Sequence, residues 1–145
     1  MVSRAQLQAT TSIVLVVAIL ASGWFEQYAK GSGGRFTVDG FSVWVGSPFA
    51  LLLIPAVLAH SVRAQLVVLV VAAILAVGGL LLYWDAMFVH IDAQGALVFL
   101  FIPLYQLVAV AITLGWVIYA RVRAHLAANG TIERDARKSG ARPSL

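Results

Sequence analysis

The acidic segment between the last two apolar stretches contains the residue types that most often bind a metal ion. Asp85, His90 and Asp92 place two carboxylates and an imidazole close together in the sequence. Such ligands suit a hard or borderline divalent cation. Their spacing matches no established metal motif, however, and Asp92 shortly before Gly95 is equally typical of a helix N-cap. We therefore expect these residues to be structural or solvated, with a metal site as the weaker alternative.

Polar residues inside or beside the apolar stretches are candidates for a polar cavity. The four candidates are Glu26, Tyr105, Gln106 and Thr113. An acid inside a membrane is a functional-site hypothesis by default, although Glu26 lies near a boundary where it can reach water. Gln106 and Thr113 recur at helical spacing on one face, which should point inward because lipid offers no partner for an amide. An interhelical hydrogen bond of about 0.6–2 kcal/mol is the simpler interpretation of Gln106.

No catalytic or cofactor motif accompanies these residues. The sequence has no cysteine, which excludes disulfides, thiolate metal sites and cysteine nucleophiles. Paired haem ligands would need two histidines at one depth, whereas His60 ends one apolar stretch and His125 follows another. No apolar stretch contains a lysine for a retinal Schiff base, and no hydrolase triad, phosphate loop or metalloprotease motif is present. The sequence therefore predicts neither an enzyme nor a bound cofactor.

Four long apolar stretches determine the fold class. They cover about residues 7–25, 45–62, 65–86 and 95–121. A hydrocarbon core of about 30 Å is crossed by about 20 apolar helical residues. Hydrophobic residues make up 61% of the chain and charged residues 11%, against about 45–50% and 25% in soluble domains. The sequence predicts an all-α integral membrane protein, with residues 1–128 forming a single bundle of four transmembrane helices.

The distribution of charge predicts the orientation of the bundle. Four spans place both termini on one side, together with all Lys and Arg residues except Lys30 and Arg35. The positive-inside rule then predicts N-in/C-in topology, which we interpret as a bacterial inner membrane with both termini in the cytoplasm. Asn129-Gly130 predicts the end of the last helix. Residues 129–145 should form a basic, mostly disordered tail that attracts anionic lipid headgroups rather than nucleic acid, with a short polar helix over Thr131–Lys138 as an alternative.

The first outer connection, residues 35–45, is predicted to form a small β-hairpin. Asp39-Gly40 between alternating residues is the strongest short-range hairpin signal. A two-residue turn places Trp44 on one face and an apolar group on the other, made of Phe36, Val38, Phe41 and Val43. Because an isolated hairpin is marginal in water, this apolar face should lie on the bundle, the bilayer or a partner. We interpret these five residues as a candidate docking surface.

The second stretch is the least regular of the four. Ser47-Pro48 resembles an N-cap followed by proline at the first helical position, which would make this span short. A start before Pro48 is the alternative. Pro55 is expected to disturb the same helix near its middle.

Two hypotheses about function follow from these features. The first is a non-catalytic accessory, assembly or immunity-type protein that binds another membrane protein or a toxin. The second is a small transporter or channel that works as a homo-oligomer, since one four-helix subunit rarely encloses a full pathway. Glu26 and the Gln106–Thr113 face are the sequence features that favour the second hypothesis.

Overall fold

The computed structural model describes residues 3–29, 31, 38–89 and 95–138, with the backbone alone described for 95–96 and 131–138. Its elements are α1 (Arg4–Ala29), α2 (Gly40–Leu58), α3 (Val62–Trp84), a π-helical turn η1 (Asp85–Val89) and α4 (Gly95–Lys138). The described residues form helices and no strands. Four of these helices are long and apolar enough to cross a membrane. The predicted class, a helical membrane protein, is confirmed.

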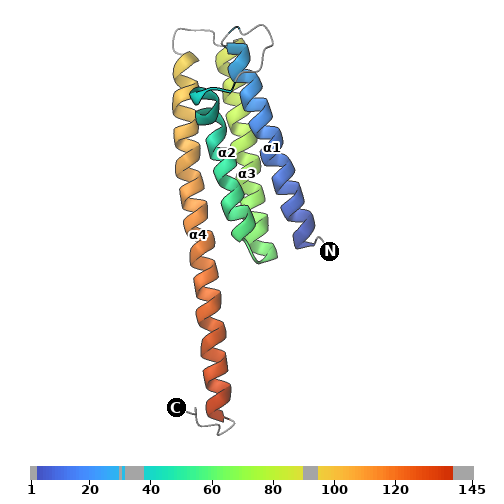
Figure 1. Ribbon diagram of the computed structural model, residues 1–145, viewed down its shortest axis with the longest axis vertical. Helices are drawn as coiled ribbons and strands as arrows, with labels where there is room; N and C mark the ends of the chain where they lie inside the picture. Colours follow the sequence, from blue (N-terminus) through green and yellow to red (C-terminus); the bar gives the residue numbers. More distant parts are fainter. Residues whose placement is uncertain (1–2, 30, 32–37, 90–94, 139–145) are drawn as a thin grey trace.

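The four helices run alternately up and down in one bundle (Figure 1). The last residues of α1 and α3 and the first residues of α2 and α4 lie at one end, which we call the connection end. The short α2–α3 turn lies at the other end, on the same side as the first residue of α1. Helix α1 packs against α2 and α3, while α4 packs mainly against α2. Helix α4 then continues far beyond the α2–α3 turn as a single projecting helix (Figure 1).

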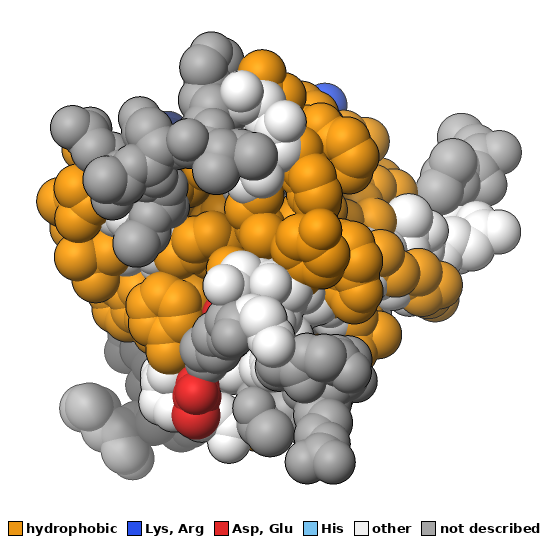
Figure 2. Space-filling model, turned by 90° about the horizontal axis from the view of Figure 1, so that it is seen from above, with side chains coloured by type: hydrophobic (Ala, Val, Ile, Leu, Met, Phe, Trp, Pro, Cys, Tyr) orange, Lys and Arg blue, Asp and Glu red, His pale blue; other side chains and the backbone are white. Residues whose placement is uncertain are grey.

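Apolar side chains fill the bundle along its length. The central cluster consists of Leu15, Ala18, Phe49, Leu52, Ala72, Ala76 and Val110. Its alanines allow helix backbones to approach closely, as membrane helix interfaces require. Large apolar side chains such as Ile13 and Ile74 also point outward, and hydrophobic side chains cover much of the surface seen from the connection end (Figure 2). An apolar exterior around an apolar core suits a protein that is surrounded by lipid.

Helix α2 begins where the sequence predicted a β-hairpin. The Asp39 carboxylate accepts hydrogen bonds from the backbone N–H groups of Phe41 and Ser42, both at 3.0 Å, and so caps the helix. The hairpin prediction is wrong for residues 40–45, which form the first turns of α2; Phe36 lies outside the described residues. One reason is that Asp39 before Gly40 also suits a helix N-cap. The apolar run that follows also buries Val45, Phe49 and Leu52 at i, i+4 and i+7, the spacing of one helix face.

The two prolines of the second stretch both lie inside α2. The helix therefore has the earlier start that the sequence left open, and Pro48 is not its first residue. Proline has no N–H, so Pro48 cannot donate to the carbonyl of Trp44 four residues earlier. The hydroxyl of Ser47 donates to that carbonyl instead, at 2.8 Å. This local hydrogen bond lets the helix continue through Pro48.

Helix α4 also continues where the sequence predicted an end. Its backbone is helical through Asn129-Gly130 to Lys138, so the predicted stop at Asn129-Gly130 is wrong, and residues 131–138 continue α4 instead of forming a separate short helix or a disordered tail. A glycine inside a helix costs only about 1 kcal/mol relative to alanine. In the sequence, Glu133 and Arg137 are four residues apart, a spacing at which opposite charges favour a helix.

Candidate functional site

A polar cluster at the connection end contains the acid singled out from the sequence. Glu26 of α1 is fully buried, and the hydroxyl of Ser42 in α2 donates to its Oε2 at 2.6 Å. The Gln27 amide lies 3.4 Å from the same oxygen and 3.5 Å from the Ser42 hydroxyl. Ser42 Oγ is also 3.2 Å from the Asp39 carboxylate. The cluster therefore ties the end of α1 to the capped start of α2.

The other members of the predicted polar cavity lie apart from this cluster. Gln106 of α4 is buried and donates to the backbone carbonyl of Leu75 in α3 at 3.0 Å. Thr113 donates to the carbonyl of Ala109 within its own helix. Tyr105 is 72% exposed, whereas its neighbour Gln106 is buried. The structure thus gives each of these residues a separate environment and does not bring them together.

The predicted docking residues lie around the start of α2. Val38 and Val43 are exposed, Phe41 is 37% exposed, and Trp44 is half-buried. Phe41, Val43 and Trp44 lie in the first turns of α2 and Val38 lies just before it, so the four do not form one face of a ribbon. Of the metal candidates, Asp85 lies exposed in the π-helical turn, while His90 and Asp92 fall outside the described residues. Within the described part of the chain, no three potential metal ligands come together.

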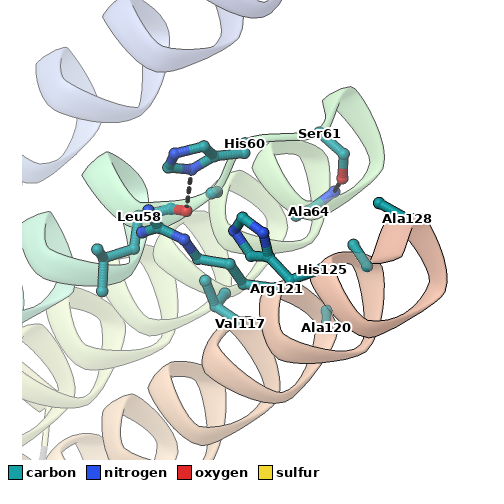
Figure 3. A pocket seen from close by; sticks show the side chains of 11 residues that line it. Leu58, His60, Ser61, Ala64, Val117, Ala120, Arg121, His125 and Ala128 are labelled. Atoms are coloured by element: carbon teal, nitrogen blue, oxygen red, sulfur yellow. Dashed lines mark hydrogen bonds between the residues drawn. The ribbon is translucent and has the colours of Figure 1, made fainter. Parts of the chain in front are cut away.

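A second polar site lies at the opposite end of the bundle, in the angle between the α2–α3 turn and α4. It is a cavity of about 430 Å³. We call it the basic pocket, because His60, Arg121 and His125 gather around it (Figure 3). The rest of the lining is small or apolar and includes Leu58, Ala59, Ser61, Ala64, Val117, Ala120, Ala124 and Ala128. None of the lining residues is acidic.

The local sequence explains both the shape and the charge of the basic pocket. Ala120, Ala124 and Ala128 recur every four residues along α4, so their small side chains leave space beside the α2–α3 turn. Arg121 and His125 have the same spacing and lie on the same face. Apolar packing below the pocket, which includes Ala59, Val68 and Val117, holds the turn against α4.

The opposite face of α4 carries an apolar stripe. Tyr119, Val122 and Leu126 follow at i, i+3 and i+7, and all three are exposed. We call these three residues the α4 stripe. At 100° per residue the stripe lies on the far side of the helix from Val117 and Ala124, which line the pocket. Arg123 is exposed beside it and does not line the pocket.

Sequence reasoning considered His60 and His125 only as haem ligands and missed the basic pocket. The signal was present in two places. Arg121 and His125 lie one helical turn apart at the end of the last span, and His60 lies in the tight link between the second and third spans. Each place follows an even number of spans, so the sequence predicts both on the same side of the membrane. Only the packing of α4 against α2, which the sequence does not reveal, brings the two places together.

Comparison of the chain with family models, curated proteins and solved structures finds no match.

Proposed function

We propose that this chain is a non-catalytic membrane protein that acts as an accessory, assembly or immunity-type partner of another membrane protein. The observation that supports this most is the α4 stripe. Leu126 is 67% exposed on a helix that projects beyond the rest of the bundle. Exposed apolar residues need no partner where lipid covers them, but they do outside the hydrocarbon core.

The flanking charges indicate where the hydrocarbon core ends along α4. Arg121 and Arg123 would be costly near the centre of a bilayer, so they mark the boundary region. Leu126 follows them, and the helix from Arg121 to Lys138 is about 25 Å long at 1.5 Å per residue. The end of the α4 stripe is therefore available to a protein at the membrane surface. Arg123 lies beside the stripe and residues 121–130 include no acid, which favours a partner with an acidic surface.

Orientation is part of the proposal. We place both termini and the α4 extension in the cytoplasm of a bacterium, with the connection end outside the inner membrane, on the positive-inside rule. The absence of natural cysteine makes this simple to test. With an impermeant maleimide, Val38→Cys should react in intact cells and Leu126→Cys only after lysis. The reverse pattern would overturn the orientation.

Site-specific photo-crosslinking tests the docking surface. A photoreactive amino acid at position 126 should give one discrete adduct with a second membrane protein, through a peptide that contains Asp or Glu. The matched control is position 124, because Ala124 lies two residues away and lines the basic pocket on the other face. Equal adducts at both positions, or adducts with lipid alone at position 126, would contradict docking at the stripe.

The exposed residues around the start of α2 give a second place for a partner. Val38 and Val43 remain exposed although no hairpin forms there. A crosslinker at position 38 should capture the partner if it, or a toxin, approaches from the connection end. Capture at position 126 alone would restrict docking to the α4 stripe.

A homo-oligomeric transporter or channel is the second candidate function. The fully buried Glu26 favours it, because buried acids in membrane proteins often belong to ion or proton pathways. If this function is correct, Glu26→Gln should reduce ion or proton flux in reconstituted vesicles. Equal flux in the parent protein and in vesicles without protein would rule this candidate out.

A further inference from the structure

We infer that the basic pocket is a binding site for a phosphate group, and that the headgroup of an anionic phospholipid is its source. This inference is separate from docking at the α4 stripe, because the pocket lies on the opposite face of α4. The cavity of about 430 Å³ is within the range of roughly 300–1,000 Å³ found for small-ligand sites. A phosphoglycerol headgroup is of suitable size for such a space.

The charges around the pocket favour an anion over a metal cation. Arg121 carries a permanent positive charge, and guanidinium groups pair with phosphate through parallel charge-assisted hydrogen bonds. Figure 3 shows its side chain reaching across the pocket toward Leu58, with the rings of His60 and His125 nearby. Two histidines alone could suit a metal, but the guanidinium would repel a cation held between them. None of the lining residues offers a carboxylate to offset that repulsion.

A hydrogen bond of His60 determines which of its ring nitrogens can contact a ligand in the pocket. Its Nδ1 lies 2.5 Å from the backbone carbonyl of Leu58. A carbonyl only accepts, so Nδ1 carries the hydrogen and Nε2 is the nitrogen that remains for a ligand. In the imidazolium form Nε2 also carries a hydrogen and can donate it to an anion. His125, one turn beyond Arg121 on the same face, adds a second imidazole.

The N-terminal end of α3 also favours an anion in the basic pocket, but more weakly. Ser61 is the N-cap of α3, and its hydroxyl accepts from the backbone N–H of Ala64 at 3.1 Å. Both residues line the pocket. The N-terminal end of a helix carries a partial positive charge, which favours an anion beside it.

The position of the pocket favours a lipid headgroup over a soluble phosphate. It lies where α2 ends and α3 begins, two helices that are apolar enough to span a membrane. Its floor is apolar and includes Ala59 and Val117, whereas its basic residues are exposed. An apolar floor beneath a basic rim at the end of a span matches the boundary between acyl chains and headgroups.

Native mass spectrometry of the full chain in detergent, with added phosphatidylglycerol or phosphatidylcholine, tests the inference. We expect one phosphatidylglycerol per chain to survive delipidation, in preference to phosphatidylcholine. Arg121→Gln should weaken its retention about tenfold or more, the typical effect of losing a charge-assisted hydrogen bond. Arg123→Gln is the matched control, since it removes the same charge two residues away outside the pocket and should bind as the parent does.

A second pair of variants separates a shaped site from general attraction to basic charge. Ala124→Leu fills the cavity without changing any charge and should abolish the adduct, whereas Ala127→Leu, which does not line the pocket, should leave it unchanged. Equal losses for Arg121→Gln and Arg123→Gln, or a retained adduct in Ala124→Leu, would overturn the site.

Inorganic phosphate distinguishes the two sources of the ligand. A thermal shift of the delipidated protein by inorganic phosphate, dependent on Arg121 and seen without any lipid adduct, would support the phosphate site and overturn the lipid as its occupant. If neither phosphatidylglycerol nor inorganic phosphate binds in an Arg121-dependent way, the whole inference fails.

Discussion

The side-chain amide of Gln106 donates from Nε2 to the backbone carbonyl oxygen of Leu75, 3.0 Å away across the interface of α4 and α3. This hydrogen bond depends on Gly79, one turn further along α3. A Cβ atom at Gly79 would lie closer than 3.0 Å to Gln106 Nε2, nearer than real Cβ atoms approach. The glycine therefore provides the space in which the amide reaches the opposite helix.

The neighbouring glycines of α3 give the first prediction. Gly79→Ala should lower the free energy of unfolding by about 1–3 kcal/mol, because the added methyl displaces the Gln106 amide. Gly78→Ala is the control: a Cβ there meets nothing within 4 Å, so this change should be neutral or stabilise by up to about 1 kcal/mol. Equilibrium unfolding in mixed detergent micelles measures the free energy of unfolding of both variants.

A double mutant tests the cause of that loss. In a Gln106→Ala background, Gly79→Ala should cost much less than in the parent, because the displaced amide is absent. An unchanged cost would show that the methyl group conflicts with some other neighbour.

The second prediction concerns the bond between Ser42 and Glu26. Ser42→Ala removes the 2.6 Å hydrogen bond that joins α2 to α1, and should cost about 1–3 kcal/mol because it removes a donor to a buried carboxyl group. Ser22 is the control: its hydroxyl is equally buried but has no hydrogen-bond partner among the described residues. Ser22→Ala should therefore be neutral or slightly stabilising, and an equal cost for both variants would contradict this account.

Sequence alone predicted the membrane class, since the apolar stretches are too long and too numerous for a small soluble domain. It could not decide between two local structures for Asp39-Gly40, which suits both a hairpin turn and a helix cap. The helix forms because the apolar run that follows packs around Val45 and Phe49. The sequence alone also did not predict the basic pocket, because that site depends on which helix packs beside the α2–α3 turn.

The third prediction concerns how α2 continues through Pro48. Ser47→Ala removes the hydroxyl that donates to the carbonyl of Trp44 at 2.8 Å. This change should lower the free energy of unfolding by about 1 kcal/mol. Pro48→Ala restores a backbone N–H that can donate to the same carbonyl. In the Pro48→Ala background, Ser47→Ala should then have little effect on the unfolding free energy. A similar cost in both backgrounds would show that the hydroxyl does not replace the missing N–H.

The fourth prediction decides between the capped helix and the hairpin at the start of α2. Gly40 is the first residue of the helix, and Asp39 before it is extended, with φ −126° and ψ −177°. Proline is favoured at a first helical position and follows an extended residue readily, so Gly40→Pro should be tolerated within about 1 kcal/mol. A hairpin turn at Asp39-Gly40 would need positive φ at both residues, which proline cannot adopt. Unfolding measurements and helical content by circular dichroism would distinguish the two: a loss of several kcal/mol in Gly40→Pro, together with an unchanged Ser42→Ala, would favour the hairpin.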